Sequence, residues 1–398
     1  MVIKNYYDSK IKNTFIGLIV SFCLNEKIDD FSIDDEAYVG ICNLAKFHSL
    51  EYLIYSSLEF NGIKLKDNEK KAKNSLLYKC ITQMSELDNI KYKLNEEHIY
   101  HIPLKGSIIR TFYPDPAARE MADLDILVHR NEMKRMRKIM TKELGYQAVA
   151  LTSNSPHDSF MKKPFMEVEI HRKLMVDYSK VASYLSKSFD RCSTEEGNPY
   201  TYLLKDDDFY IYNIMHNVKH FSKGGTGFRI FIDLFYSFKK IKYDFDYITN
   251  ELKQFDLDTY NNRLISITNK LFSCLDLDSD EAFLLDYFIC AGTYGTIDND
   301  IISNVLVNNQ EEDNLDKNRK KYLWVRLFPP LSVMRDRNPS LNKAPFLLPW
   351  FWFTRICKGA LKFRTYKAQA SRINSVDDND LETRKRVKDI TKIDPYDW

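Results

Sequence analysis

The sequence predicts an α+β protein that is mostly helical, with one small mixed sheet between helical N-terminal and C-terminal regions. Aromatic residues make up 14% of the 398 residues, while glycine and proline number 12 each, which favours helical packing over a loop-rich β fold. Apolar residues recur at helical spacing on both sides of a central stretch. That stretch contains short β-like runs separated by helices, so we expect the sheet there.

Four regions follow from this pattern. Residues 1–98 are expected to be an N-terminal helical region, because apolar side chains recur at helical spacing in 15–20, 50–58 and 75–94. Residues 99–176 are expected to form the α/β core, with β-like runs at 100–104, 123–129, 147–151 and 165–171. A short helix at 107–113 and an amphipathic helix at 131–144, stopped by Gly145, complete the core.

Residues 177–376 are expected to return to helices as a C-terminal helical region. Aspartates 206–208 favour a helix start before 210–220, glycines 224, 225 and 227 mark a loop, and another helix is expected at 228–240, with helices continuing through Phe288. The charged segment 308–321 is expected to be exposed or linking. Residues 377–398 are polar enough to predict a loosely ordered tail.

Composition limits the location and the partners. The formal charge of +2 provides no overall electrostatic basis for binding a nucleic acid or an anionic bilayer. The seven cysteines are scattered without a CxxC pair, and the N-terminus lacks the apolar core of a signal peptide, so a cytoplasmic protein is expected. No apolar run reaches the ~18 residues of a membrane span. Segment 344–353, aromatic and broken by two prolines, is expected to be buried; the alternative is a peripheral membrane contact beside Arg355 and Lys358.

The most informative motif joins a glycine turn to a pair of aspartates. Gly106 and Ser107 follow an apolar run and precede the short helix, which leaves backbone N–H groups available for phosphate. Asp123 and Asp125 would project from the same face of a strand, while Leu124 and Ile126 face the core. Two carboxylates held in this way predict a divalent metal site beside the phosphate site.

A third carboxylate is expected from a neighbouring strand. In the run Phe165 to His171, Glu167, Glu169 and His171 alternate with apolar residues and share one face. We expect Glu169 to complete the metal site, with Glu167 and His171 in supporting positions. Each motif alone has a plain structural explanation, such as an ordinary turn or a solvent-facing strand edge. Their order and separation favour one shared site.

These motifs resemble the uncharacterised nucleotidyltransferase family of the DNA polymerase β superfamily. The resemblance rests on Leu-Lys-Gly-Ser at 104–107, on the run 113–128 ending in Asp-Leu-Asp-Ile-Leu-Val, and on Val-Glu-Ile-His at 168–171. Segments 216–220, 227–233, 327–330 and 347–349 are similar to features of the same family. The resemblance implies a polymerase β-like nucleotidyltransferase module in which nucleoside monophosphate, expected to be AMP, passes from an NTP to a hydroxyl acceptor and pyrophosphate is released.

The resemblance also implies residue roles. Gly106 and Ser107 would bind the β- and γ-phosphates, and Asp123, Asp125 and Glu169 would hold Mg²⁺, or Mn²⁺ in its place. Glu169 or a metal-bound hydroxide would assist deprotonation of the acceptor. Ile108, Ile109 and Arg110 follow the Gly-Ser pair, where the superfamily often has a more polar helix. Lys105 and Arg119 lie beside the motifs as candidate partners for triphosphate charge, and each is equally explained as a surface charge.

Other residues and functions stay open. His216 and His220 share a helix face and with Asp233 could imitate a metal site, but a structural network with Arg229 and Asp233 is favoured. A protein or small-molecule acceptor is expected ahead of RNA, because the net charge is near neutral. The alternative functions are a catalytically silent nucleotide-binding or toxin–antitoxin-type regulator and a glycosyltransferase that binds metal through Asp123-Leu124-Asp125.

Overall fold

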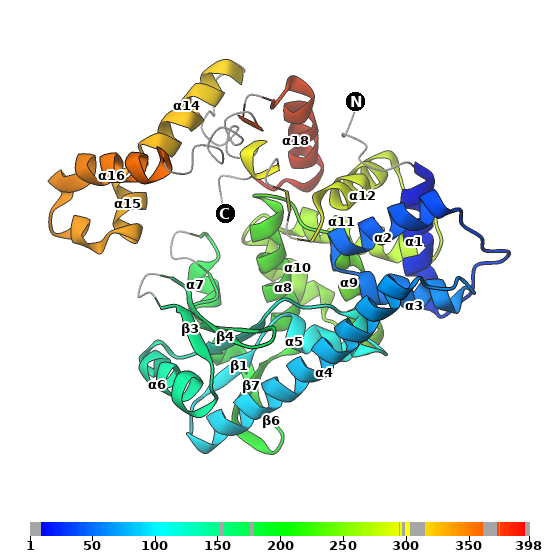
Figure 1. The fold of residues 1–398 in the computed structure, drawn as a ribbon, viewed down its shortest axis with the longest axis horizontal. Helices are drawn as coiled ribbons and strands as arrows, with labels where there is room; N and C mark the ends of the chain where they lie inside the picture. Colours follow the sequence, from blue (N-terminus) through cyan, green and yellow to red (C-terminus); the bar gives the residue numbers. More distant parts are fainter. Residues whose placement is uncertain are drawn as a thin grey trace.

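The predicted α+β class is confirmed. The computed structural model describes residues 9–151, 155–175, 179–293, 295–296, 299–302, 315–360, 372–373 and 375–394. Helices predominate in these residues, and their strands form a seven-stranded sheet with both parallel and antiparallel neighbours. Figure 1 shows this sheet in the lower half of the molecule, with helices on both sides of it.

The strand order of the sheet is β3-β4-β5-β2-β1-β7-β6. The pairs β2/β5 and β1/β7 are parallel, and all other neighbours are antiparallel. The strands are β1 (His101–Pro103), β2 (Leu124–Val128), β3 (Gln147–Ala150), β4 (His157–Lys162), β5 (Met166–His171), β6 (Cys192–Glu195) and β7 (Asn198–Leu204). Four of them match predicted runs. Strands β4, β6 and β7 were not predicted, so the sheet extends past the expected core boundary at residue 176.

Separate helices cover the two faces of the sheet. On one face, Leu124, Ile126 and Val128 of β2 pack with α4 (Asp67–Glu96) and α6 (Met133–Lys138), which continues as a π turn (Ile139–Glu143). The opposite face, to which Leu127 contributes, packs with α5 (Gly106–Ile109), followed by a 3-10 turn (Arg110–Phe112), and with α8 (Asp206–Phe221). The side chain of Asp125 belongs to this second face, so the predicted site lies between the sheet and α8.

The N-terminal and C-terminal helices share one hydrophobic core. Phe15 of the first helix packs edge-on against Phe228, and Phe231 packs against Phe288. The helices that contribute are α1 (Ser9–Leu24), α2 (Asp35–His48), α3 (Glu51–Phe60), α7 (Ala182–Leu185), α9 (Arg229–Lys240), α10 (Phe245–Lys253), α11 (Asp258–Phe272) and α12 (Ser279–Ala291). The expected helices around 210–220 and 228–240, and the glycine loop between them, are confirmed.

The expectation of a loosely ordered C-terminal tail is wrong for residues 378–391. They form α18 (Asp378–Thr391), which begins with a capping box between Asp377 and Asp380. Val387 and Ile390 are buried in the main core, and the Arg384 guanidinium donates to the backbone carbonyl of Ser222 and to the Tyr287 hydroxyl. A few apolar side chains on one face therefore anchor a helix whose average composition is polar.

The expectation that segment 344–353 is buried is also wrong. The segment covers the turn Pro345–Leu347 and the start of α16 (Leu348–Ala360), and in it Phe346 is 79% and Trp350 is 60% exposed. Trp352 of α16 packs on Phe328, which directly follows α14 (Leu315–Leu327). Helix α15 (Leu331–Arg337) lies between α14 and α16 in the chain. Residues 308–314 of the predicted charged segment lie outside the described residues. No described helix is both long enough and apolar enough to cross a membrane.

Candidate active site

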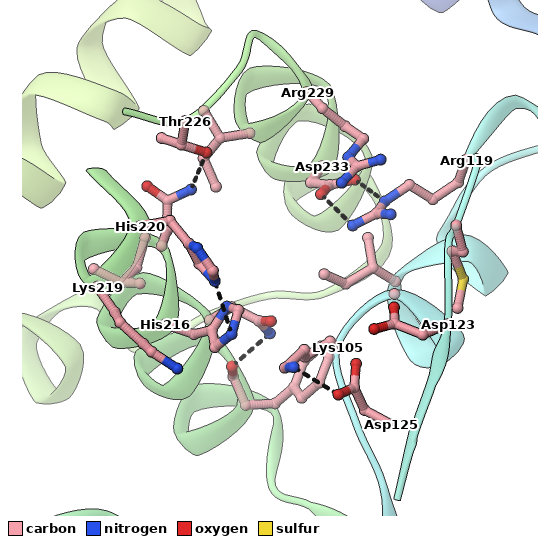
Figure 2. A pocket seen from close by; sticks show the side chains of 18 of the residues that line it. Lys105, Arg119, Asp123, Asp125, His216, Lys219, His220, Thr226, Arg229 and Asp233 are labelled. Carbon is pink, nitrogen blue, oxygen red and sulfur yellow. Dashed lines mark hydrogen bonds and ion pairs between the residues drawn. The ribbon is translucent and has the colours of Figure 1, made fainter. Parts of the chain in front are cut away.

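The three predicted carboxylates lie together because two parallel strands pair in register. Asp125 of β2 stands beside Glu169 of β5, and Asp123, two residues earlier, projects from the same face as Asp125. One ligand atom from each of the three lies within 4.8 Å of the other two. Figure 2 shows Asp123 and Asp125 pointing into the same space. We call Asp123, Asp125 and Glu169 the acid cluster.

Glu167 shares a strand face with Glu169 but lies outside the acid cluster. Glu167 comes two residues before Glu169 in β5 and pairs with Met161 of β4, whereas Glu169 pairs with Ser159. Among the described residues, the two groups close enough to hold a metal ion both contain Glu169, and neither contains Glu167. The preference for Glu169 over Glu167 therefore agrees with the geometry. The role of either residue stays a prediction.

Basic side chains contact the acid cluster. Lys105 Nζ lies 2.7 Å from Asp125 Oδ1, and His171 Nε2 lies 2.6 Å from the same oxygen. His171 Nε2 also lies 3.3 Å from Glu169 Oε2. His157 Nε2, from the unpredicted strand β4, lies 3.2 Å from Glu169 Oε1. His171 thus faces the pocket as expected, and His157 joins it because the two histidines are directly paired across β4 and β5.

The neighbours separate the acidities of the two aspartates. Burial raises the pKa of Asp123 to about 6, and the nearby charge of Asp125 adds to this rise. Burial acts in the same direction on Asp125, but hydrogen bonds from His171 and Lys105 outweigh it and hold the pKa of that carboxyl below its usual value. The same balance between burial and the His171 hydrogen bond lowers the pKa of Glu169. All three carboxyl groups are therefore ionised at neutral pH.

Metal binding is expected to strengthen as the pH rises through about 6, where Asp123 loses its proton. Below that pH the neutral carboxyl is a poor ligand, and above it the ionised group contributes a full negative charge. Calorimetric titration of the protein with Mg²⁺ at a series of pH values measures this directly. The variant Asp123→Asn should lose the part of this step that belongs to Asp123; His171, whose pKa is raised by its hydrogen bonds to Asp125 and Glu169, contributes the part that remains. A step near the ordinary aspartate value of 3.8 would contradict the account.

The Gly106–Ser107 turn lies at the edge of the same space. Gly106 lines the cavity, and a Cβ there would lie 3.0 Å from Met121 Sδ and 3.2 Å from an Arg119 nitrogen, so a larger residue would require these side chains to shift. The Ser107 side chain is buried, and its hydroxyl donates to the Leu104 carbonyl at 2.6 Å. A phosphate at this turn would therefore meet backbone N–H groups rather than the serine hydroxyl. Phosphate binding here stays a prediction.

Arg119 belongs to a buried ion pair. Its Nε and one terminal nitrogen donate to the two oxygens of Asp233 at 2.8 and 3.0 Å, and the Tyr113 hydroxyl donates to the same carboxylate at 2.6 Å. Arg229 donates to the Glu120 carbonyl. The expected network of His216 and His220 with Asp233 is therefore wrong, because Asp233 pairs with Arg119 on the neighbouring wall (Figure 2). Arg119 still lines the cavity, with its charge already balanced.

His216, Lys219 and His220 form a second wall opposite the acid cluster. They share one face of α8, and Figure 2 shows them across the cavity from Asp123 and Asp125, with the two histidines in contact. We call these three residues the α8 wall. Burial, with the charges of Lys105 and Lys223, lowers the pKa of Lys219. Burial holds the pKa of His216 well below its usual value. The pKa of His220, which is partly open to solvent, is lowered to about 4 by partial desolvation and by the charges of Lys219 and Lys105, so both imidazoles are neutral at pH 7.

The cavity between the acid cluster and the α8 wall has a volume of about 430 Å³. Sequence reasoning missed Lys219 and His157 in its lining. Lys219 could have been found, because it stands between two histidines on the same helix face, opposite the apolar face of Ile214 and Val218. His157 had no such signal, because β4 lacks a regular apolar alternation and was not predicted as a strand.

The residues of the acid cluster suit a hard divalent cation. Mg²⁺ and Mn²⁺ prefer carboxylate oxygens as ligands. The pairing of β2 with β5 brings three carboxylates together, those of Asp123, Asp125 and Glu169. A second possible group, His157, Glu169 and His171, adds imidazole nitrogens, which Mn²⁺ accepts more readily than Mg²⁺. The site can therefore hold a divalent cation next to a cavity that carries basic side chains.

Comparison with known proteins places the chain in a family. No curated protein and no solved structure matches it. A family model described as "Uncharacterised nucleotidyltransferase" matches residues 39–273, a span that contains the Gly106–Ser107 turn, the acid cluster and the α8 wall. The match covers more than half of the chain and every strand of the sheet. The chain belongs to this family of uncharacterised nucleotidyltransferases.

Proposed function

We propose that the protein transfers a nucleoside monophosphate, with AMP as the expected case, from an NTP to a hydroxyl acceptor. The acceptor oxygen forms a bond to the α-phosphorus, the α–β bridging P–O bond breaks, and pyrophosphate leaves with the bonding electrons. The observation that carries this proposal is the placement of three carboxylates that could hold a metal ion and of the α8 wall, with Lys219, on opposite sides of one cavity. Triphosphate transfer needs both charges in one site.

Asp123, Asp125 and Glu169 would hold Mg²⁺ or Mn²⁺, which when bound neutralises triphosphate charge and favours attack at the α-phosphorus. Lys105 lies beside these acids and would contact the phosphates from the same side. His171 contacts both Asp125 and Glu169, which would keep these carboxylates oriented to hold a metal ion. Glu169 would accept the proton of the acceptor hydroxyl, and His157 lies 3.2 Å away to receive it from there.

The α8 wall would bind the terminal phosphates of the nucleotide. Lys219 lines the cavity beside two imidazoles that contact each other, are neutral at pH 7 and can donate hydrogen bonds. A cationic side chain placed away from the α-phosphorus binds the leaving pyrophosphate and stabilises the charge that develops on it. In this arrangement the nucleotide lies across the cavity, from the acid cluster to α8.

Replacing Lys219 by alanine is expected to raise the KM for NTP about tenfold, because one charge-assisted contact to phosphate is lost. The loss of kcat should be smaller than the rise in KM if the contact forms already in the bound substrate. Steady-state kinetics with the preferred NTP measures both constants. Lys240→Ala, at an exposed position at the end of α9, is the matched control. Equal changes in KM in the two variants would show that Lys219 does not bind the nucleotide.

The acceptor can be identified by labelling. The purified protein is incubated with Mg²⁺, a cell lysate and each α-labelled NTP in turn, and the products are separated into protein, RNA and small-molecule fractions. Label in the protein or small-molecule fraction is the expected result. Label retained only as bound nucleotide, with no transfer into any fraction, would support the silent regulatory alternative. A glycosyltransferase would transfer no nucleotide label and release no pyrophosphate.

A further inference from the structure

The unit formed by α14, α15 and α16 presents an apolar surface to solvent. Phe346, Leu347, Trp350 and Phe353 recur at helical spacing along the turn Pro345–Leu347 and α16, and all four are exposed. Trp350 and Phe353 stack loosely, with ring centroids 6.1 Å apart. We call these four residues the aromatic face. Large exposed apolar patches of this kind are uncommon on soluble proteins and mark interaction surfaces.

The aromatic face points away from the unit's own small core. Trp352 lies on the other side of α16, where its indole N–H donates to the Pro329 carbonyl at 2.9 Å and its ring meets Phe328 edge-on. Figure 1 shows α14, α15 and α16 grouped together, apart from the sheet and from the helices α1 to α12. Trp352 and Phe328 thus contribute to the unit's internal packing, together with the buried Met334 and Leu341, whereas Trp350 and Phe353 are exposed.

The region of the sequence that contains and flanks α14, α15 and α16 is strongly basic. Residues 301–376 contain 14 of the 58 lysines and arginines but 5 of the 56 acidic residues, a net charge of +9. The rest of the chain therefore carries −7, although the whole chain is close to neutral at +2. Lys320 and Lys343 are exposed within this region, and Arg355 is half-buried on α16. The net charge of the whole chain does not reveal this basic region, because the acidic remainder of the chain offsets it.

We propose that the aromatic face docks on an anionic membrane surface. Tryptophan and phenylalanine side chains on one helix face, in a region of the chain that is rich in lysine and arginine, suit the boundary between headgroups and acyl chains. Neither signal alone holds a protein on a bilayer firmly, but inserted aromatic rings and attraction to anionic lipid act together. Leu347 favours a bilayer over RNA as the partner, because an aliphatic side chain inserts between acyl chains but provides no ring on which bases stack.

The test uses the full-length protein and sedimentation with vesicles. Vesicles of phosphatidylcholine containing phosphatidylglycerol should bind the protein, and vesicles of phosphatidylcholine alone should bind it far more weakly. Added salt should weaken the binding, and tryptophan fluorescence should shift to the blue as Trp350 leaves water. The double variant Trp350→Ser/Phe353→Ser should bind anionic vesicles about tenfold more weakly or worse, because two inserted rings are lost.

Leu275→Ser is the matched control, because Leu275 is 62% exposed at a distant position and its loss should leave vesicle binding unchanged. Circular dichroism of the double variant should match that of the unaltered protein, because both replaced side chains are exposed. Absence of binding to anionic vesicles would overturn the proposal, as would equal binding to both kinds of vesicle. Self-association, or RNA binding, that the double variant loses while vesicle binding persists would equally overturn it.

Discussion

Replacing Asp125 by asparagine is expected to reduce nucleotidyl transfer on the order of 10³-fold, because the divalent ion loses its most strongly ionised ligand. Asp125 lies at the centre of the acid cluster, and its contacts with Lys105 and His171 hold its pKa below the usual value. An amide has no charge, so it binds a divalent cation weakly and leaves the triphosphate charge uncompensated. Pyrophosphate release from α-labelled NTP and calorimetric binding of Mg²⁺ measure the two effects.

Glu167→Gln is the matched control for this experiment. Glu167 lies on the same strand and the same face as Glu169 but outside the acid cluster, so its replacement should change transfer and metal affinity little. Glu169→Gln should instead follow Asp125→Asn. If Asp125→Asn kept its activity while circular dichroism showed an intact fold, the acid cluster would not be the metal site. If Glu167→Gln were as damaging as Glu169→Gln, the choice between the two glutamates would be reversed.

Replacing Asp233 by alanine is expected to lower the free energy of unfolding by about 3–5 kcal/mol, the usual effect of removing one partner from a buried ion pair. Arg119 and Asp233 are both buried, and the carboxylate also accepts the Tyr113 hydroxyl. Without it, the buried Arg119 guanidinium loses both of its hydrogen bonds to the Asp233 carboxylate. The pair joins the loop before β2 to α9, so its loss loosens the wall of the cavity. Urea unfolding followed by circular dichroism measures the change.

Asp35→Ala is the control for the Asp233 variant. Asp35 pairs with Lys66 on the surface, and its side chain is 93% exposed, so the free energy of unfolding should stay unchanged within error. Asp233→Asn should lie between the two, because the amide oxygen keeps one acceptor for Arg119 but not the charge. A loss in Asp233→Ala no larger than in Asp35→Ala would show that the buried pair contributes nothing to stability.

The acid cluster could be predicted because its signals are local. Alternation along β2 puts Asp123 and Asp125 on one face, and alternation along β5 does the same for Glu169 and His171. The one step that the sequence could not provide was the register of these two strands. The structure pairs Asp125 with Glu169, which is the register that brings the three carboxylates together.

The α8 wall could not be assigned to the site from sequence because its position depends on tertiary packing. His216 and Lys219 follow the acid cluster by many residues, and nothing in the local pattern says that α8 crosses above β2. The same holds for Asp233, whose partner Arg119 lies on a distant loop. Helical spacing predicts that the two histidines pair, as they do, but the carboxylate expected to join them, Asp233, pairs with Arg119 instead.

The errors in the fold have physical causes of three kinds. Strands β4, β6 and β7 contain polar or proline residues in place of a regular apolar alternation, so pairing with neighbours rather than their own pattern makes them strands. Helix α18 was mistaken for a tail because its polar average concealed buried Val387 and Ile390. Segment 344–353 was expected to be buried because it is apolar, yet apolar residues can also form an exposed binding surface.

Parallel reactions with α-labelled and γ-labelled NTP in the presence of Mg²⁺ and lysate test the central claim most directly. The account predicts that the α-label becomes attached to an acceptor while the γ-label appears only in pyrophosphate, and that Asp125→Asn abolishes both outcomes. Transfer of the γ-label to an acceptor would contradict the account, because it would identify phosphoryl rather than nucleotidyl transfer. Binding of NTP without release of pyrophosphate would contradict it as well.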